Sequence, residues 1–291
     1  MLTAIPGWYG LTAAKTYLAL EPKTNLTIID FDDSVGGVWA KKRIYPNLVA
    51  QVPHGLFNYP DRPMPKEGET NHNLVTGYMI QNYLEKFAED HDLLRRIRFN
   101  TWVETAERCP RGWRLKTGEN EYLEATKLIV STGLTSVPNV PPFAVEKDSM
   151  PVIHSRGIAA SVPFFRSDDV QGVCVVGSAK SAYDAVYLLC SMGKRVTWII
   201  RPDGAGPMPI MPAEIGGVNT ISLGSTRLMN YLSPSILNSD GAVASFFYRT
   251  ALGRWLTNAH WRWITRLSNE AAGYDKDANI GPLKPEMPDK R

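Results

Sequence analysis

Two stretches of the chain show the same succession of apolar and polar segments. The first begins with an apolar lead over residues 2–5, which predicts a strand, and continues into the turn Gly7-Trp-Tyr-Gly10. Apolar residues at helical spacing then predict a helix over 11–20, and the β-branched run 25–29 predicts a buried strand that ends at Asp30. The apolar face of this helix consists of Leu11, Ala14, Leu18 and Ala19. The order is strand, glycine turn, helix, strand and acid.

The same order returns about 170 residues later. Val173–Val176 predicts a second buried strand, the turn 177–182 follows, and a helix is predicted through 183–192. A further strand over 196–200 ends at Arg201. Two strand–helix–strand units of this kind predict an α/β fold with two dinucleotide-binding, Rossmann-like domains. We place the boundary between residues 1–165 and residues 166–291.

Two other patterns bear on the core and on membranes. An amphipathic helix is predicted over 77–88, with Ile80, Leu84 and Phe87 facing inward. The most apolar late stretch, 241–267, is interrupted by four arginines, so we expect no integral membrane segment. We expect its aromatic residues to pack in the core or in a lid. They are Phe246, Phe247, Trp255, Trp261 and Trp263.

The composition is that of a globular protein and gives no sign of a nucleic-acid binder or a disulfide-rich protein. The 291 residues are 44% hydrophobic and 21% charged, which is typical of a globular protein with a substantial core. A formal net charge of +3 without a long basic run gives no indication of nucleic-acid binding. The three cysteines are widely spaced and form no CxxC pair, so we expect neither a disulfide framework nor a metal site. No secretory signal is evident at the N-terminus, and we expect a cytoplasmic protein.

The first turn has the chemistry of a dinucleotide site. Glycines let the backbone N–H groups and the helix N-terminus approach a pyrophosphate, while an acid about 20 residues further on accepts hydrogen bonds from a ribose. Gly7 and Gly10 suit the first role, and Asp30, 20 residues after Gly10, suits the second. The pattern departs from G-x-G-x-x-G at Ile5, where we expect strain and a weakened site.

The second turn has the same chemistry, but a cation takes the place of the acid. Gly177 begins it, and alanines replace the second and third glycines at Ala179 and Ala182. Arg201 stands where a binder of the ribose 2′-hydroxyl would carry an acid, and a cation there accommodates a 2′-phosphate. The second unit is therefore predicted to bind NADP rather than NAD.

Several short motifs resemble those of one enzyme family. They are Gly36-Gly-Val-Trp39, Tyr45-Pro-Asn-Leu48, Phe57-Asn-Tyr59, Ser131-Thr-Gly-Leu-Thr-Ser-Val-Pro138 and Trp198-Ile-Ile-Arg201-Pro-Asp-Gly-Ala-Gly-Pro207. Together they resemble the fungal flavin-containing monooxygenases and the related Baeyer–Villiger enzymes over most of the chain. The resemblance implies FAD and NADP as cofactors. It implies a reaction in which NADPH reduces FAD and one oxygen atom of O2 enters an organic substrate, here a secondary-metabolite intermediate.

The resemblance also implies roles for individual residues. Those expected at FAD are Gly7, Gly10, Asp30, Gly37, Val38, Trp39 and Tyr45. Those expected at NADP are Gly177, Ser178, Lys180, Ser181 and Arg201. Gln51 takes the place of the family's flavin-pocket asparagine as the catalytic candidate. Of the motif F-x-G-x-x-x-H only His154 is retained, since Asp148 and Met150 replace the phenylalanine and glycine.

The ends of the chain raise a further expectation. In the family the NADP domain is inserted into the FAD domain, and the chain then returns to complete the FAD sheet. That return is absent from these 291 residues, so we expect the faces it would occupy to be exposed, covered by another chain, or unfolded. Three functions remain: a monooxygenase, a truncated inactive remnant, and a non-redox accessory or cyclase-like module. The visible spectrum of bound flavin discriminates the first from the others.

Overall fold

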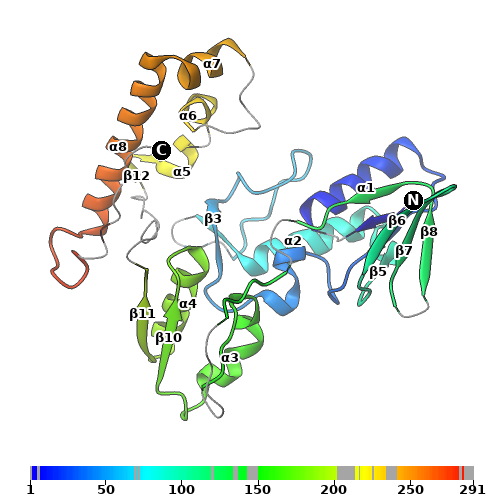
Figure 1. Ribbon diagram of the computed structural model, residues 1–291, viewed down its shortest axis with the longest axis horizontal. Coiled ribbons are helices and arrows are strands. Elements are labelled where there is room, and N and C mark those ends of the chain that lie inside the picture. The colour runs from blue at the N-terminus through cyan, green and yellow to red at the C-terminus, as the bar shows by residue number, and fades with distance from the viewer. Residues whose placement is uncertain are drawn as a thin grey trace. The chain divides into compact units, whose positions relative to one another are not determined.

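The chain forms two compact units in a computed structural model (Figure 1). The structure describes residues 2–4, 7–68, 70, 73–118, 121–133, 137–142, 150–201, 214–215, 217–224, 226–233, 241–281 and 284. Unit 1 comprises Met1–His54 and Asn58–Ser167, and unit 2 comprises Gly55–Phe57 and Asp168–Arg291.

A parallel sheet is the centre of unit 1. Its strand order is β5 (Ile97–Arg98), β2 (Thr27–Ile29), β1 (Leu2–Ala4) and β9 (Leu128–Val130), so the first strand lies in the interior of the sheet. Helix α1 (Trp8–Leu20) connects β1 to β2. The predicted strand, turn, helix and strand are confirmed. The helix begins three residues earlier than predicted, and Ala19 is exposed rather than on the buried face.

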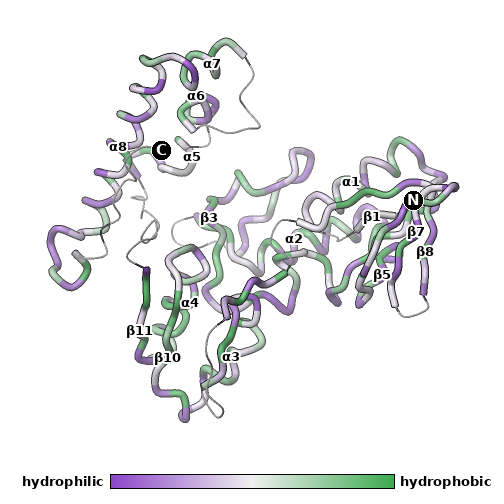
Figure 2. Tube along the Cα trace, viewed as in Figure 1, coloured by the Kyte–Doolittle hydropathy of each residue, from purple (hydrophilic) through white to green (hydrophobic). Residues whose placement is uncertain are grey.

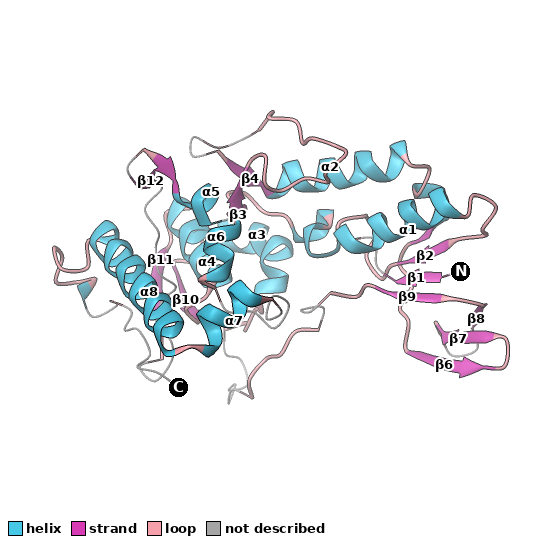
Figure 3. Ribbon diagram, turned by 90° about the horizontal axis from the view of Figure 1, so that it is seen from above, coloured by secondary structure: helices cyan, strands magenta, loops and turns pink. Residues whose placement is uncertain are grey.

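Both faces of this sheet are covered. Ile28 and Ile29 point to opposite faces of β2, and both are buried. Ile29 packs with Leu115 and Ala125 of an antiparallel meander, and Figure 3 shows α1 on one side of the sheet and this meander on the other. The meander comprises β6 (Thr105–Cys109), β7 (Gly112–Lys116) and β8 (Tyr122–Ala125).

Helix α2 (Gly77–Asp90) supplies much of the core of unit 1. Its residues Ile80, Leu84 and Phe87 are almost fully buried, so the predicted inward face is confirmed. Thr76 caps the helix, because its hydroxyl accepts a hydrogen bond from the N–H of Met79. The remaining elements of unit 1 are η1 (Gly37–Trp39), η2 (Lys41–Arg43), β3 (Val49–Pro53), β4 (Leu74–Thr76), η3 (Leu94–Arg96), η4 (Ser155–Gly157) and α3 (Ile158–Arg166).

Unit 2 begins with the second strand–helix–strand pattern. Strand β10 (Gly172–Val176) pairs in parallel with β11 (Arg195–Ile199), and α4 (Lys180–Ser191) connects them. This confirms the second predicted unit, although α4 begins three residues before the predicted helix. The later elements are β12 (Glu214–Ile215), β13 (Val218–Asn219), α5 (Thr220–Gly224), α6 (Arg227–Tyr231), α7 (Ala242–Arg249) and α8 (Ala251–Ala272).

The packing of α8 differs from the sequence prediction. Hydrophilic and hydrophobic residues alternate along this helix (Figure 2), and its buried positions include the small residues Gly253, Thr257 and Ser268. A Cβ on Gly253 would overlap the backbone of Phe246, so α7 and α8 approach closely there. Of the predicted core or lid packing, the core alternative is wrong for the exposed aromatic side chains, and the lid alternative stays a prediction. Those more than a third exposed are Phe246, Trp255, Trp261 and Trp263.

Candidate functional site

The first turn brings two glycine segments against each other. Gly7 is the N-cap of α1, and a Cβ built on it would lie 3.7 Å from Cα of Gly37. Gly36, with φ of +129°, admits no side chain, because its Cβ would lie 2.7 Å from the carbonyl carbon of Trp39. Gly10 is buried in the first turn of α1. The N-terminus of α1 and the Gly36–Gly37 corner thus present backbone without side chains, which is the surface that a pyrophosphate requires.

Asp30 lies directly after β2, with 1% of its surface exposed. Its Oδ1 accepts a hydrogen bond from the N–H of Asp32 at 3.0 Å, and its backbone is bonded to Arg98 and Thr101. Its Oδ2 is buried and has no hydrogen-bond partner among the described residues. Burial raises the pKa of this carboxyl from its usual 3.8 to about 6, against the opposing effects of the Asp32 N–H and the Arg43 charge. Oδ2 is therefore an acceptor that a ligand hydroxyl would satisfy.

Next to Asp30, two arginines stack on one aromatic ring. The guanidinium carbons of Arg43 and Arg156 lie 5.3 and 4.9 Å from the centroid of Phe31. Arg43 also pairs with Asp32 at 2.7 Å, and both side chains are largely buried. Burial raises the pKa of Asp32 although both arginines oppose the shift. This cluster has no signature in the sequence, because Arg156 is far from Phe31 along the chain and no motif links them.

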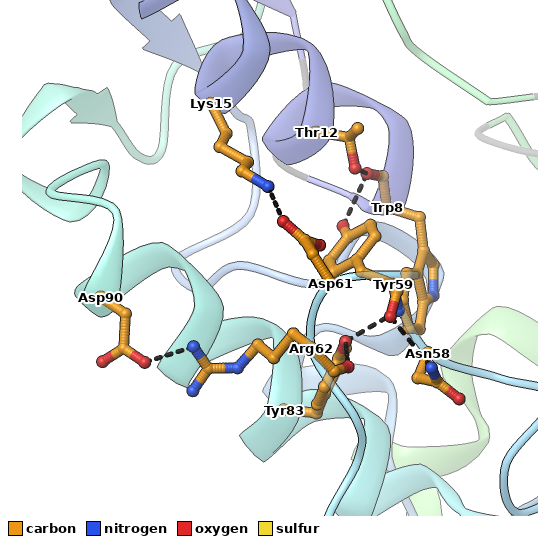
Figure 4. Close-up of polar contacts among 9 residues, drawn as sticks. All are labelled: Trp8, Thr12, Lys15, Asn58, Tyr59, Asp61, Arg62, Tyr83 and Asp90. Carbon is orange, nitrogen blue, oxygen red and sulfur yellow. Dashed lines mark hydrogen bonds and ion pairs between the residues drawn. The ribbon is translucent and has the colours of Figure 1, made fainter. Parts of the chain in front are cut away.

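A hydrogen-bonded aromatic cluster fixes the start of α1 (Figure 4). The Tyr59 hydroxyl donates to the carbonyl of Trp8 at 2.7 Å. The Tyr83 hydroxyl, on α2, accepts from the N–H of Tyr59 at 2.8 Å and donates to the carbonyl of Arg62 at 2.7 Å. The ring centroids of Tyr59 and Phe87 lie 4.2 Å apart. Because Trp8 is the first residue of α1, these contacts hold the helix end at the glycine corner.

Three further predicted FAD residues follow that corner. Val38 and Trp39 belong to η1, and Val38 is 54% exposed. Tyr45 is buried. The structure therefore leaves Val38 accessible and places Tyr45 within the packed part of unit 1.

The second turn, at Gly177, is hydrogen-bonded to the neighbouring strand β11. Gly177 follows β10 with φ of +128°, a conformation that favours glycine. Its N–H donates to the carbonyl of Ile199 at 3.0 Å, and its carbonyl accepts from the indole N–H of Trp198 at 2.6 Å. These bonds to β11 set the direction in which the chain enters α4.

The other predicted NADP residues surround this turn. Ser178 is half-buried and Ser181 is exposed. Lys180 is the first residue of α4, and its ammonium pairs with Asp184 at 2.5 Å. Arg201 lies just beyond β11 and is exposed. The strand pairing therefore brings the turn and Arg201 to the same end of the parallel strands.

The remaining candidates lie elsewhere or outside the described residues. Gln51 is exposed on β3, which pairs with β4 in a sheet of its own. His154 caps η4, since its Nδ1 accepts the N–H of Arg156 at 3.2 Å. Ile5 and Asp148 lie outside the described residues, so the expected strain at Ile5 stays a prediction.

The described part of the chain contains no group of three His, Cys, Asp or Glu residues arranged to hold a metal ion. None of its helices combines the length and apolarity needed to cross a membrane. Cys109, Cys174 and Cys190 are free thiols.

Comparison with known families identifies the chain. Residues 57–212, more than half of the sequence, match the family described as pyridine nucleotide-disulphide oxidoreductase. The chain belongs to this family. Both the second turn and the tyrosines Tyr59 and Tyr83 lie within the matched residues.

Curated relatives of the chain include fungal proteins named FAD-dependent monooxygenases. It is 44% identical over 283 residues to the FAD-dependent monooxygenase DEP4 of Alternaria brassicicola, an alignment that covers 96% of this chain and 48% of the relative. It is 43% identical over 282 residues to the protein of the same name from Fusarium langsethiae, again covering 96% and 48%. The resemblance to fungal flavin monooxygenases is confirmed. The chain spans about half the length of these relatives.

Solved structures support the same fold. A cyclohexanone monooxygenase from Rhodococcus sp. Phi1 bound to NADP+ superposes with a TM-score of 0.65 at 18% identity, covering 98% of this chain and 59% of that one. An oxidised steroid monooxygenase bound to NADP gives 0.60 at 18% identity, with coverage of 98% and 59%. The predicted α/β class with Rossmann-type units is confirmed.

Proposed function

We propose that this chain carries the FAD and NADPH sites of a monooxygenase that transfers one oxygen atom of O2 to an organic substrate, a secondary-metabolite intermediate. The fungal relatives, which are named FAD-dependent monooxygenases, support this reaction class. We assign FAD to residues 1–165 and NADP to residues 166–291, in a cytoplasmic enzyme. The buried, unpaired Oδ2 of Asp30 is the observation that carries the proposal.

The residues of unit 1 fit FAD. The ribose hydroxyls of its adenosine would donate to Asp30 Oδ2, which removes the cost of a buried acceptor without a partner. Gly7 and Gly37, whose backbones approach each other without side chains, would hold the pyrophosphate together with Gly10 in the first turn of α1. Val38, Trp39 and Tyr45 would lie toward the flavin.

The residues of unit 2 fit NADP. The turn formed by Gly177 and Ser178, with Ser181 in the first turn of α4, would hold the pyrophosphate, and Lys180 would add a cation. Arg201, exposed at the end of β11, would form charge-assisted hydrogen bonds with the 2′-phosphate.

When bound, NADPH supplies a hydride and FAD supplies the redox chemistry with O2. The chain binds and orients the two groups. Asp32, Arg43 and Arg156 hold the segment that presents Asp30, and the Tyr59–Tyr83 cluster holds the end of α1. Gln51 would donate and accept hydrogen bonds in the flavin pocket.

The test is a titration of the purified chain with FAD, followed by visible absorbance and flavin fluorescence. We expect the wild type to bind FAD. Asp30→Ala should weaken binding by about 1–3 kcal/mol, or roughly 5- to 150-fold, because the ribose hydroxyls lose a charged acceptor.

The matched control is Asp33→Ala. Asp33 lies on the same loop, but its side chain is 38% exposed and pairs with Lys42 at the surface. This control should leave FAD affinity unchanged. A wild type that takes up no FAD, or equal losses in both variants, contradicts the proposal.

A further inference from the structure

Lys180 occupies a position that helix stability does not favour. It is the first residue of α4, where the positive end of the helix dipole repels a cation. The first turn of α4 contains no acidic residue to offset this charge. An anion bound in front of the helix would account for a lysine here.

The structure holds the lysine charge away from that position. Its Nζ lies 2.6 and 2.5 Å from the two carboxylate oxygens of Asp184, which is one turn further along α4 and only 12% exposed. The ammonium is therefore drawn along the helix toward its C-terminal end. A lysine four residues before an acid is the weaker of the two orders for such a pair on a helix.

The turn at Gly177 has less conformational freedom than the Lys180 side chain. The carbonyl of Gly177 is fixed by the indole of Trp198, and its N–H is bonded to β11. The flexible group next to the proposed phosphate position is thus the Lys180 side chain. The Asp184 carboxylate and a dinucleotide phosphate would compete for its ammonium group.

We propose that Asp184 is a positioning residue that sets the affinity of unit 2 for NADPH by holding Lys180 away from the phosphates. On binding, Lys180 exchanges the Asp184 carboxylate for a phosphate oxygen, and the ion pair between the two side chains is lost. This inference rests on the proposed NADP site. Asp184 therefore lowers NADPH affinity while it stabilises the unliganded helix.

The experiment is a titration of the full chain with NADPH, followed by nucleotide fluorescence, for the wild type, Asp184→Asn, Lys180→Met and the double variant. We expect Asp184→Asn to bind NADPH about fivefold more tightly, which corresponds to about 1 kcal/mol. We expect no such gain in the Lys180→Met background, because the gain requires the released ammonium. Asp184→Glu restores the pair and should return the affinity to the wild-type value.

A matched control removes the same charge elsewhere in unit 2. Glu270→Gln breaks the Arg266–Glu270 pair on α8, which has the same four-residue spacing, and should leave NADPH affinity unchanged. Unchanged or weaker binding by Asp184→Asn, or a gain that persists without Lys180, overturns this inference alone. A wild type that binds no NADPH overturns it together with the proposed NADP site, and leaves the FAD proposal standing on its own titration.

Discussion

At the residue scale, the charge of Asp30 links pH to FAD binding. Its pKa of about 6 leaves the carboxyl mostly protonated at pH 5, and hydroxyl donors from the ribose favour the charged form. FAD should therefore bind more tightly at pH 7 than at pH 5. Asp30→Asn should bind FAD weakly at both pH values and lose this dependence. Flavin titrations across this range measure it, and a parallel pH dependence in Asp30→Asn would assign the effect to another group.

The same shift determines how Asp30 affects stability without FAD. Because its folded pKa lies above the unfolded value of 3.8, the folded state binds the proton more tightly, and stability falls as pH rises from about 4 to about 6. The cost at pH 7 is about 3 kcal/mol from a shift of about two pKa units. Asp30→Asn should therefore unfold at higher urea concentration than the wild type at pH 7, with the difference gone below pH 4.

At the scale of elements, Tyr83 connects α2 to α1 through Tyr59. Tyr83→Phe leaves the buried N–H of Tyr59 without its acceptor, so the free energy of unfolding should fall by about 1–3 kcal/mol. Urea unfolding of unit 1 measures this loss. Tyr78→Phe is the matched control, since Tyr78 lies on the same helix but is 54% exposed, and it should change stability little. Equal effects of the two variants would show that the hydroxyl of Tyr83 contributes no more than a surface group.

At the scale of the whole molecule, each unit is proposed to recognise its own dinucleotide. Arg201→Ala should raise the dissociation constant for NADPH by about 10- to 100-fold, because a guanidinium–phosphate contact is lost. It should leave the affinities for NADH and FAD nearly unchanged. Asp30→Ala should instead weaken FAD binding and leave NADPH affinity nearly unchanged. Equal losses for NADPH and NADH would give Arg201 a structural role in unit 2 instead of a 2′-phosphate contact.

The sequence itself determined the helices and strands of the two strand–helix–strand units and the position of the two turns between them. Apolar periodicity depends on neighbouring residues, so β2, α2, β10 and β11 were predictable from short windows. The placement of Asp30 and Arg201 at strand ends follows from the same local pattern. Helix starts were less predictable, since Tyr59 contacts the carbonyl of Trp8 and Trp198 contacts the turn before Lys180, and neither contact is visible in a short window.

Only the tertiary structure decided what surrounds these residues. Burial of Asp30 depends on the packing of unit 1, and this burial leaves Oδ2 unpaired and raises its pKa. The stacking of Arg43 and Arg156 on Phe31 joins residues that no local pattern relates. The buried positions of α8 include Gly253, which packs against the backbone of Phe246, while Trp255 is exposed, and an aromatic count does not reveal this. The physical reason is common to all three, because desolvation, stacking and close packing depend on which distant residues the fold brings within contact distance.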